Sequence, residues 1–194
     1  MATQAISKSY IVSDPPAITD LFSNTRWSFL WLAIRLYLGY EWFTHGLEKL
    51  ANPAWAVTGD ALKGFWSRAV QIPETGSPAI AFGWYRSFLG ALLESGSYTW
   101  FAKLVVAGEI LIGVALILGL FTGIAAFLGG FMNWNFMMAG AASVNPVFFV
   151  LSILLLLAWK TAGWIGLDRW LLPLLGVPWK PGVLFKKTSE EPAT

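Results

Sequence analysis

The chain has 194 residues, of which 56% are hydrophobic and only 12% are charged, and its formal net charge is +2. A soluble domain of this size needs far more charge to cover its surface, so the composition excludes an ordinary soluble protein and predicts an integral membrane protein. The near-zero net charge also gives no reason to expect a nucleic-acid partner.

Four stretches are apolar over the length of about 20 residues that a membrane-spanning helix needs. In chain order they cover approximately residues 27–48, 100–118, 121–140 and 146–164. The segments between them do not resemble flexible linkers, so we expect a single all-α domain over residues 1–194, folded as a four-helix membrane bundle. The first 25 residues lack the apolar core of a signal peptide, and we expect them to be retained.

The distribution of Lys and Arg predicts the orientation, because cytoplasmic loops carry an excess of positive charge. A cytoplasmic N-terminus would place seven of these residues inside, namely Lys8, Arg26, Lys160, Arg169, Lys180, Lys186 and Lys187. Five would lie outside, namely Lys49, Lys63, Arg68, Arg86 and Lys103. We therefore expect a multi-pass protein of the cytoplasmic membrane with both termini in the cytoplasm.

Residues 52–97, between the first two spans, are too many for a structureless loop in a compact domain. Apolar residues recur at helical spacing in GDALKGFWSRAV (59–70) and again in AFGWYRSFLGALLES (81–95). These patterns predict two amphipathic helices that lie on the outer membrane surface. They are either a lid over the bundle or a passive membrane anchor, and the pattern alone slightly favours the anchor.

Small residues follow one another along the second and third spans, including Gly108, Gly113, Gly123 and Gly129. Small side chains let helix backbones approach closely, which is how helices associate in lipid. The two spans should pack as an antiparallel pair, and a homodimer through such faces is plausible.

Ionisable residues interrupt the first span within RLYLGYEWFTHGLEKL, namely Arg35, Glu41, His45, Glu48 and Lys49. At 100° per residue all of them fall within an arc of roughly 140°. Because a charge in the bilayer core is costly unless it is paired or hydrated, this face should point into the bundle. Glu109 of the second span lies at a compatible depth to pair with Arg35.

The roles of these residues have both structural and chemical readings. Arg35 paired with Glu109 or Glu41 can simply fix the helix register, and for Arg35 alone this reading is favoured. His45, the only histidine, lies one turn from both Glu41 and Lys49, where a group that titrates near neutrality can move protons. The candidate catalytic residues are therefore Arg35, Glu41, His45, Lys49 and Glu109.

Further residues are candidates for substrate binding. The cations Lys63, Arg68, Arg86 and Lys103 should make the outer mouth electropositive, and Trp55 and Trp66 should line it. Asn133 and Asn135 of the third span are also candidates, although buried asparagines more often serve helix packing.

The chain contains no cysteine and one histidine. This composition excludes disulfides, cysteine-ligated iron–sulfur clusters and a bis-histidine haem, and it makes a metal site improbable. Any redox chemistry should therefore use a dissociable organic carrier.

Three motifs carry a family resemblance: RLYLGYEWFTHGLEKLANPAW, GEILIGVALILGL, and GGFMNWNFMMAG followed by SVNP. They resemble the DoxX and DoxD family across all four spans. In that family an arginine, a glycine four residues on, and a GxxK ending of the first helix recur, and here they are Arg35, Gly39, Gly46 and Lys49. Glu109 fits the GE of the second helix.

The resemblance implies a four-helix membrane protein, and DoxD-like members are associated with oxidation of thiosulfate to tetrathionate coupled to quinone reduction. It therefore implies a small sulfur anion as donor, membrane quinone as acceptor and a possible small partner subunit. Two alternatives stand beside this enzyme: a non-catalytic scaffold or assembly subunit of a membrane redox complex, and a small transporter. The transporter is less favoured because the polar residues cluster in the outer half of the spans.

Overall fold

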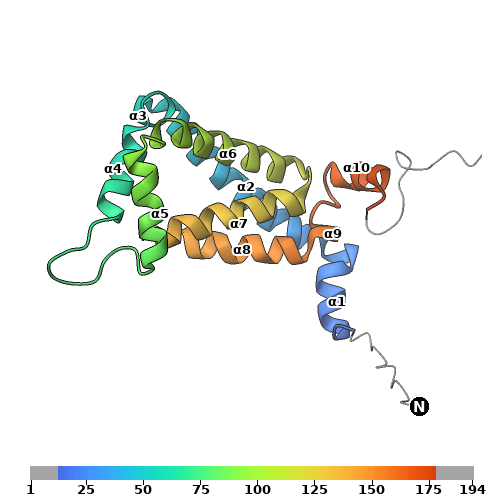
Figure 1. The fold of residues 1–194 in the computed structure, drawn as a ribbon. Coiled ribbons are helices and arrows are strands. Elements are labelled where there is room, and N and C mark those ends of the chain that lie inside the picture. Colours follow the sequence, from blue (N-terminus) through green and yellow to red (C-terminus); the bar gives the residue numbers. More distant parts are fainter. Residues whose placement is uncertain (1–12, 178–194) are drawn as a thin grey trace, which may run out of the picture.

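Four long helices run side by side along the molecule (Figure 1). The computed structural model describes residues 13–177, and within that range the regular structure is helical. The long helices are α2 (Ser28–Ala51), α6 (Tyr98–Leu118), α7 (Thr122–Met138) and α8 (Asn145–Leu157). The all-α prediction is confirmed. Four residues of the charge count lie outside the described residues, namely Lys8, Lys180, Lys186 and Lys187.

Shorter helices gather at the two ends of the long ones (Figure 1). The α4/α5 end carries α3 (Pro53–Ala56), α4 (Asp60–Ala69) and α5 (Gly83–Glu94). The α1/α10 end carries α1 (Pro16–Ser23), the 3-10 turn η1 (Thr25–Trp27), α9 (Trp159–Ala162) and α10 (Asp168–Leu175). Both helices predicted between residues 52 and 97 are thus present, as α4 and α5.

Glycines bring α2 and α6 into the closest contact of the fold. A Cβ on Gly113 would lie 2.5 Å from the backbone nitrogen of Phe43, and one on Gly46 would lie 2.9 Å from that of Ile110. A Cβ on Gly39 would similarly meet the backbone nitrogen of Ile117 at 3.0 Å. Even an alanine would push the two backbones apart, so this seam depends on small residues. By contrast, α6 contacts α7 much less extensively than it contacts α2.

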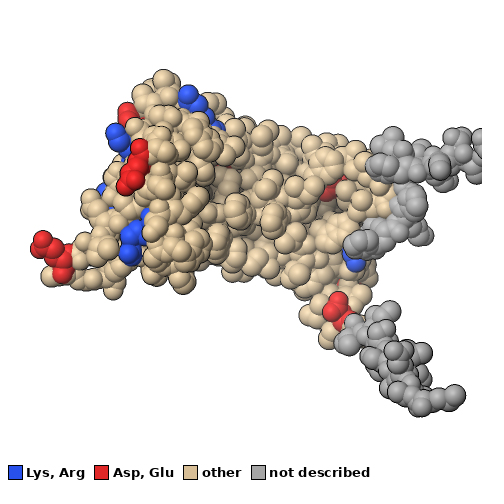
Figure 2. All heavy atoms as spheres, viewed as in Figure 1, with Lys and Arg blue, Asp and Glu red and all other residues tan. Residues whose placement is uncertain are grey.

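Charged side chains lie at the ends of the visible face, most of them at the α4/α5 end, and its long middle is free of them (Figure 2). Large apolar side chains are exposed along the long helices, for example Leu111 of α6, Ile124 of α7 and Val150 of α8. We call this surface the apolar belt. An exposed apolar surface of this extent is typical of contact with lipid.

Among the described helices, α6 alone has both the length and the apolar composition to cross a membrane. Helix α2 is longer, with 24 residues, but carries the charges of its polar face, while α7 and α8 have only 17 and 13 residues. The four predicted spans therefore stay a prediction, since the helices expected at 121–140 and 146–164 end earlier than predicted.

Candidate functional site

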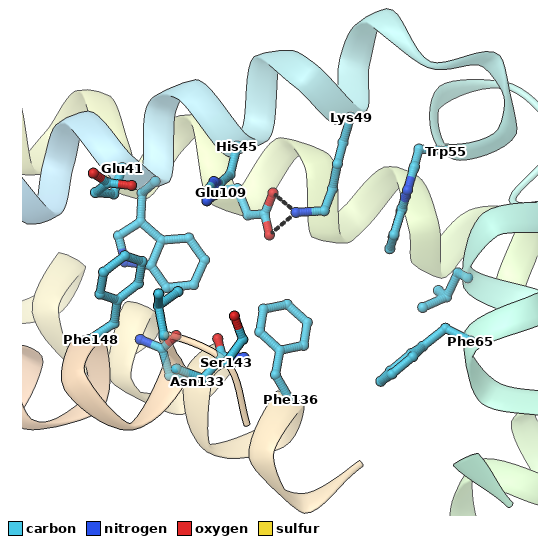
Figure 3. Close-up of a pocket in the computed structure, with 14 residues that line it drawn as sticks. Glu41, His45, Lys49, Trp55, Phe65, Glu109, Asn133, Phe136, Ser143 and Phe148 are labelled. Atoms are coloured by element: carbon cyan, nitrogen blue, oxygen red, sulfur yellow. Dashed lines mark hydrogen bonds and ion pairs between the residues drawn. The ribbon is translucent and has the colours of Figure 1, made fainter. Parts of the chain in front are cut away.

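A pocket with a volume of about 260 Å³ lies near the α4/α5 end, between α2, α6, α7 and the start of α8 (Figure 3). Helices α3 and α4 close one side of it. We call it the Lys49 pocket. Its walls are formed by Glu41, Trp42, His45, Lys49, Trp55, Leu62, Phe65, Glu109, Asn133, Phe136, Ser143, Val144, Asn145 and Phe148.

An ion pair between α2 and α6 forms one wall of the pocket (Figure 3). The Lys49 Nζ donates to both carboxylate oxygens of Glu109, each at 2.7 Å. The Glu109 side chain is 2% exposed and that of Lys49 is 23% exposed, so the carboxylate is buried while the ammonium reaches the cavity. The Lys49 ammonium also lies 5.4 Å from the centre of the Trp55 ring, within cation–π range.

Helix register explains this pairing. Gly39 of α2 faces Ile117 of α6, and Gly46 faces Ile110 and Glu109. The two helices therefore run in opposite directions, with Glu109 opposite the last turns of α2. A Cβ on Gly46 would come within 3.2 Å of the Glu109 Cβ. A glycine at this position thus lets the carboxylate approach Lys49.

His45 and Glu41 lie on the same side of the pocket as Lys49, because residues spaced four apart share a helix face. The Nδ1 atom of His45 is buried and makes no hydrogen bond within the described chain. The pocket therefore contains a carboxylate, an imidazole and an ammonium within two turns of one helix, as the polar face predicted.

Asn133 provides the most unusual polar group of the pocket. Its residue is 0% exposed, and neither the oxygen nor the nitrogen of its amide has a hydrogen-bond partner in the described chain. Most buried polar side-chain atoms in proteins are paired, and an unpaired one costs about 1–3 kcal/mol. A buried amide left unpaired beside a cavity is typical of a group that meets a ligand.

The floor of the pocket includes a strained residue in the connection between α7 and α8. Ser143 has a φ of 37°, in the left-handed region that residues other than glycine rarely adopt. Asn145 braces this connection, because its Nδ2 donates to the Ala141 carbonyl at 2.8 Å. Backbone strain of this kind is often found at functional sites.

Arg35 lies away from this pocket, at the α1/α10 end of α2. It is 1% exposed, and its Nη1 donates to the carbonyls of Leu116 (2.7 Å) and Ile117 (3.2 Å). Its Nη2 donates to the carbonyl of Ile165 at 2.7 Å. The expected ion pair between Arg35 and Glu109 is wrong: the register places the α6 C-terminus opposite Arg35, and Arg35 satisfies the carbonyls that end that helix.

Asp168 completes this arrangement, which we call the Arg35 joint. Its carboxylate accepts hydrogen bonds from the backbone nitrogens of Phe121 (2.6 Å) and Thr122 (2.8 Å) at the start of α7. Between the helices, Gly119 has a φ of 66°, and a Cβ there would clash with the Arg35 guanidinium. One cation thus caps the end of α6 and one anion caps the start of α7.

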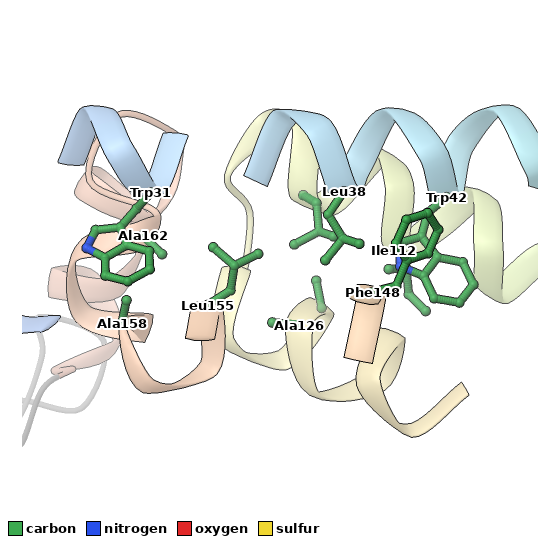
Figure 4. Packing of buried hydrophobic residues seen from close by; sticks show 11 residues of the cluster. Trp31, Leu38, Trp42, Ile112, Ala126, Phe148, Leu155, Ala158 and Ala162 are labelled. Carbon is green, nitrogen blue, oxygen red and sulfur yellow. The ribbon is translucent and has the colours of Figure 1, made fainter. Parts of the chain in front are cut away.

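An apolar cluster separates the Arg35 joint from the Lys49 pocket (Figure 4). On α2 it contributes Leu38 and Trp42, which lie between Arg35 and His45, and on α6 it contributes Ile112 and Leu116. Phe148 of α8 packs against Trp42, with ring centres 6.5 Å apart. The structure therefore does not bring Arg35 together with the other four candidate catalytic residues.

The other predicted binding residues lie at the α4/α5 end but mostly outside the pocket. Lys63, Arg68 and Lys103 are exposed, and Arg86 donates to the Ile80 carbonyl at 2.5 Å. Of the two tryptophans, Trp55 lines the pocket, whereas Trp66 is buried against Phe101.

Asn135, the second candidate asparagine, is hydrogen-bonded within the fold. The hydroxyl of Tyr85 donates to it at 3.1 Å, and its own Nδ2 donates to the Phe131 carbonyl at 2.8 Å. Burial raises the pKa of Tyr85 above the ordinary tyrosine value. This pair thus fastens α5 to α7.

Sequence reasoning missed several pocket residues, among them Phe65, Phe136, Ser143, Asn145 and Phe148. Phe65 was visible as part of an amphipathic pattern, but that pattern does not say what its apolar face covers. Asn145 belongs to the SVNP motif, which contributed to the family resemblance, but the sequence assigned no role to this residue.

Comparison with known proteins gives a family. The model of the DoxX family matches residues 30–143, which is more than half of the chain and runs from α2 to the end of the α7–α8 connection. No curated protein and no solved structure matches the chain. The matched region contains Lys49 and Glu109, which form the ion pair, and also contains His45 and Asn133.

Proposed function

Because this chain belongs to the DoxX family, we propose that it is a membrane oxidoreductase that reduces quinone in the Lys49 pocket with electrons from thiosulfate or a related small sulfur anion. The observation that carries the proposal is the Asn133 amide, which is buried at the cavity wall with both polar atoms unpaired. The family is compatible with a membrane-associated redox role, and the pocket supplies the chemistry for one.

A quinone headgroup fits the polar and aromatic groups of the pocket. The Asn133 nitrogen can donate to a quinone carbonyl, its oxygen can accept from a quinol hydroxyl, and His45 Nδ1 offers a second contact. Trp42, Phe136 and Phe148 provide flat apolar walls for a ring. A few convergent polar groups in an aromatic cavity are typical of a small-molecule site.

The reaction converts two thiosulfate ions to tetrathionate through one new sulfur–sulfur bond, while quinone takes up the two electrons together with two protons. His45 and Glu41 are placed to deliver those protons, since both line the pocket on one face of α2. Lys49 holds positive charge at the cavity, where negative charge builds up during the reduction.

The cations of the α4/α5 end support the choice of an anionic donor. Lys63, Arg68 and Lys103 are exposed at the same end as the pocket. Fixed positive charge raises the local concentration of a dianion and screens the repulsion between two of them. We therefore assign donor binding to the water-facing side of the Lys49 pocket.

A scaffold function is the second candidate, and the Arg35 joint is the observation that favours it. Within residues 13–177, the buried Arg35 side chain donates its hydrogen bonds to backbone carbonyls, which holds the end of α6 against the segment before α10 and involves no chemical step. A scaffold needs no ligand in the pocket, so ligand binding separates the two functions. A transporter is disfavoured, because the apolar cluster fills the interior between the Arg35 joint and the Lys49 pocket.

We also propose that α2, α6, α7 and α8 all cross the membrane, with both termini in the cytoplasm. The apolar belt and the length of α6 support this arrangement. The chain has no cysteine, so single cysteines report cleanly on sidedness. An impermeant maleimide added to intact cells should label Ser77→Cys but not Ala17→Cys, and the reverse pattern would overturn the orientation.

The function is tested by thiosulfate-dependent quinone reduction with the purified full chain in lipid nanodiscs. The informative variant is Asn133→Leu, and its matched control is Ser152→Ala. Both side chains are buried with unpaired polar atoms, but only Asn133 lines the Lys49 pocket. We expect Asn133→Leu to lower kcat/KM for quinone about 10- to 100-fold, equivalent to the loss of one or two buried hydrogen bonds, and Ser152→Ala to leave it unchanged.

Two results would count against the proposal. Turnover by Asn133→Leu equal to that of the wild type would remove the Lys49 pocket as the site. Absence of both turnover and bound quinone in the wild-type chain, also after addition of any co-purifying small subunit, would favour the scaffold.

A further inference from the structure

A second cavity, with a volume of about 420 Å³, lies beside the Lys49 pocket between α4, α5, α6 and α7. We call it the side slot. It exists because α6 and α7 diverge toward the α4/α5 end (Figure 1) and because Gly108 of α6 presents no side chain there. A Cβ on Gly108 would meet only the end of the Met132 side chain, at 3.3 Å from its sulfur.

The side slot is lined almost entirely by apolar side chains. Its two polar lining residues, Tyr85 and Asn135, are hydrogen-bonded to each other and to the α7 backbone. The slot thus offers hydrocarbon contacts but little polar recognition, in contrast to the Lys49 pocket with its unpaired amide and imidazole. A ligand part that binds there is a hydrocarbon chain.

The two cavities adjoin each other. Leu62 and Phe65 of α4 and Phe136 of α7 line both of them. In Figure 3, Phe136 and Phe65 stand across the cavity from the Lys49–Glu109 pair, at the side where the pocket passes toward α4. These three residues therefore lie at the boundary between a polar compartment and an apolar one.

The slot also reaches the apolar belt. Three of its lining side chains are more than half exposed, namely Leu104 (56%), Leu111 (68%) and Phe131 (53%). These residues belong to α6 and α7, so the mouth of the slot opens sideways between two long helices instead of toward the water-facing end. A ligand that enters here comes from the lipid phase.

We infer that the side slot holds the polyprenyl tail of the quinone whose headgroup occupies the Lys49 pocket. The inference rests on the proposed function for the identity of the headgroup. Continuity between a polar pocket and an apolar slot fits one amphiphile, with the ring beside Asn133 and the first isoprene units between α6 and α7. The thiosulfate side and the lipid side of the pocket are then separate, so both substrates can be present together.

The test uses a polyprenyl quinone that carries a photoreactive diazirine on its second isoprene unit, with the full chain in nanodiscs. In the wild type we expect cross-links on α6 and α7 around Leu104, Leu111 and Phe131. Gly108→Leu fills the slot and should reduce this labelling about tenfold, as expected when several buried CH₂ contacts are lost. The control Gly90→Leu introduces the same side chain on α5 into open space and should label like the wild type.

Leu111→Trp provides a second obstruction at the exposed mouth, and because Leu111 is 68% exposed we expect the larger side chain to leave folding unchanged. Undiminished labelling of α6 and α7 in both Gly108→Leu and Leu111→Trp would overturn the inference. It would also be overturned if excess palmitate or phospholipid protected the wild type from labelling as well as excess unlabelled polyprenyl quinone does, because the slot would then be a general acyl-chain site.

Binding of a tailless dimethoxy-methyl-benzoquinone separates this inference from the proposed function. If the wild type and Gly108→Leu bind the tailless ring equally while only the wild type prefers the tailed form, both proposals stand. If the ring binds but the tail cross-links elsewhere, the side-slot inference fails alone. If neither form binds to the wild type, the proposed function fails with it.

Discussion

Helix α2 carries two cations, a buried one (Arg35) and a partly exposed one (Lys49), that differ in what surrounds them. The two terminal nitrogens of Arg35 donate hydrogen bonds to backbone carbonyls at the end of α6 and before the start of α10. The Lys49 ammonium donates to the Glu109 carboxylate, beside a cavity that is lined by unpaired polar atoms. Placement of a charge inside a helix bundle therefore does not by itself identify a site; the free volume and the unpaired neighbours make the difference.

The same comparison gives a role to each residue on which the family resemblance rests. Arg35 serves the joint, Gly39 and Gly46 allow α6 to approach, and Lys49 with Glu109 forms the ion pair. The motif therefore contains both an architectural part and a part that meets the cavity, spaced along one helix.

The largest effect is expected at the Arg35 joint. Arg35→Leu leaves the carbonyls of Leu116, Ile117 and Ile165 unpaired in a buried position, and removes the cation near Asp168. We expect a loss of about 3–5 kcal/mol in the free energy of unfolding, the range for breaking a buried charged network. The loss of stability is measured as the fraction of protein that remains folded after heating in detergent. A variant as heat-resistant as the wild type would show that the Arg35 joint does not stabilise the fold.

A smaller stability effect is expected in the pocket. Lys49→Met leaves the Glu109 carboxylate buried without its partner and should cost about 2–3 kcal/mol, less than the joint because Lys49 is partly exposed. The double variant Lys49→Met/Glu109→Leu removes both charges and should recover most of this lost stability. A double variant no more stable than Lys49→Met would show that the pair does not act as a unit.

The helix cap of the joint is expected to contribute least among the charged groups. Asp168→Asn replaces one of the oxygens that accept from Phe121 and Thr122, and should cost about 1–2 kcal/mol, as loss of an N-cap does. Asp60→Asn, at the exposed first turn of α4, is the control and should change the unfolding free energy by less than about 0.5 kcal/mol. Equal shifts in the two melting curves would argue against a cap.

Much of the fold was predictable from the sequence, because hydrophobic periodicity reports which face of a helix is buried. It identified the four long helices, the two amphipathic ones and the polar face of α2. It misplaced the partner of Arg35, since pairing across helices depends on register, and the register here is set by backbone contacts at Gly39, Gly46 and Gly113.

The site was predictable in part for the same reason. His45, Glu41 and Lys49 share a face of one helix, so a helical projection finds them. Phe136, Ser143 and Phe148 come together only because α7, its connection and α8 converge on the pocket. The cap role of Asp168 was equally hidden, because it acts on backbone groups far away in the sequence.

We propose that the Lys49 pocket recognises the ligand and that the Arg35 joint serves only the architecture. The most direct test measures quinone affinity and heat resistance on the same preparations of Asn133→Leu and Arg35→Lys, since lysine keeps the charge but cannot span both sets of carbonyls. Asn133→Leu should bind quinone at least about tenfold more weakly at unchanged or higher stability, whereas Arg35→Lys should lose stability and, in its folded fraction, bind like the wild type. Weakened binding in folded Arg35→Lys together with wild-type affinity in Asn133→Leu would contradict the account.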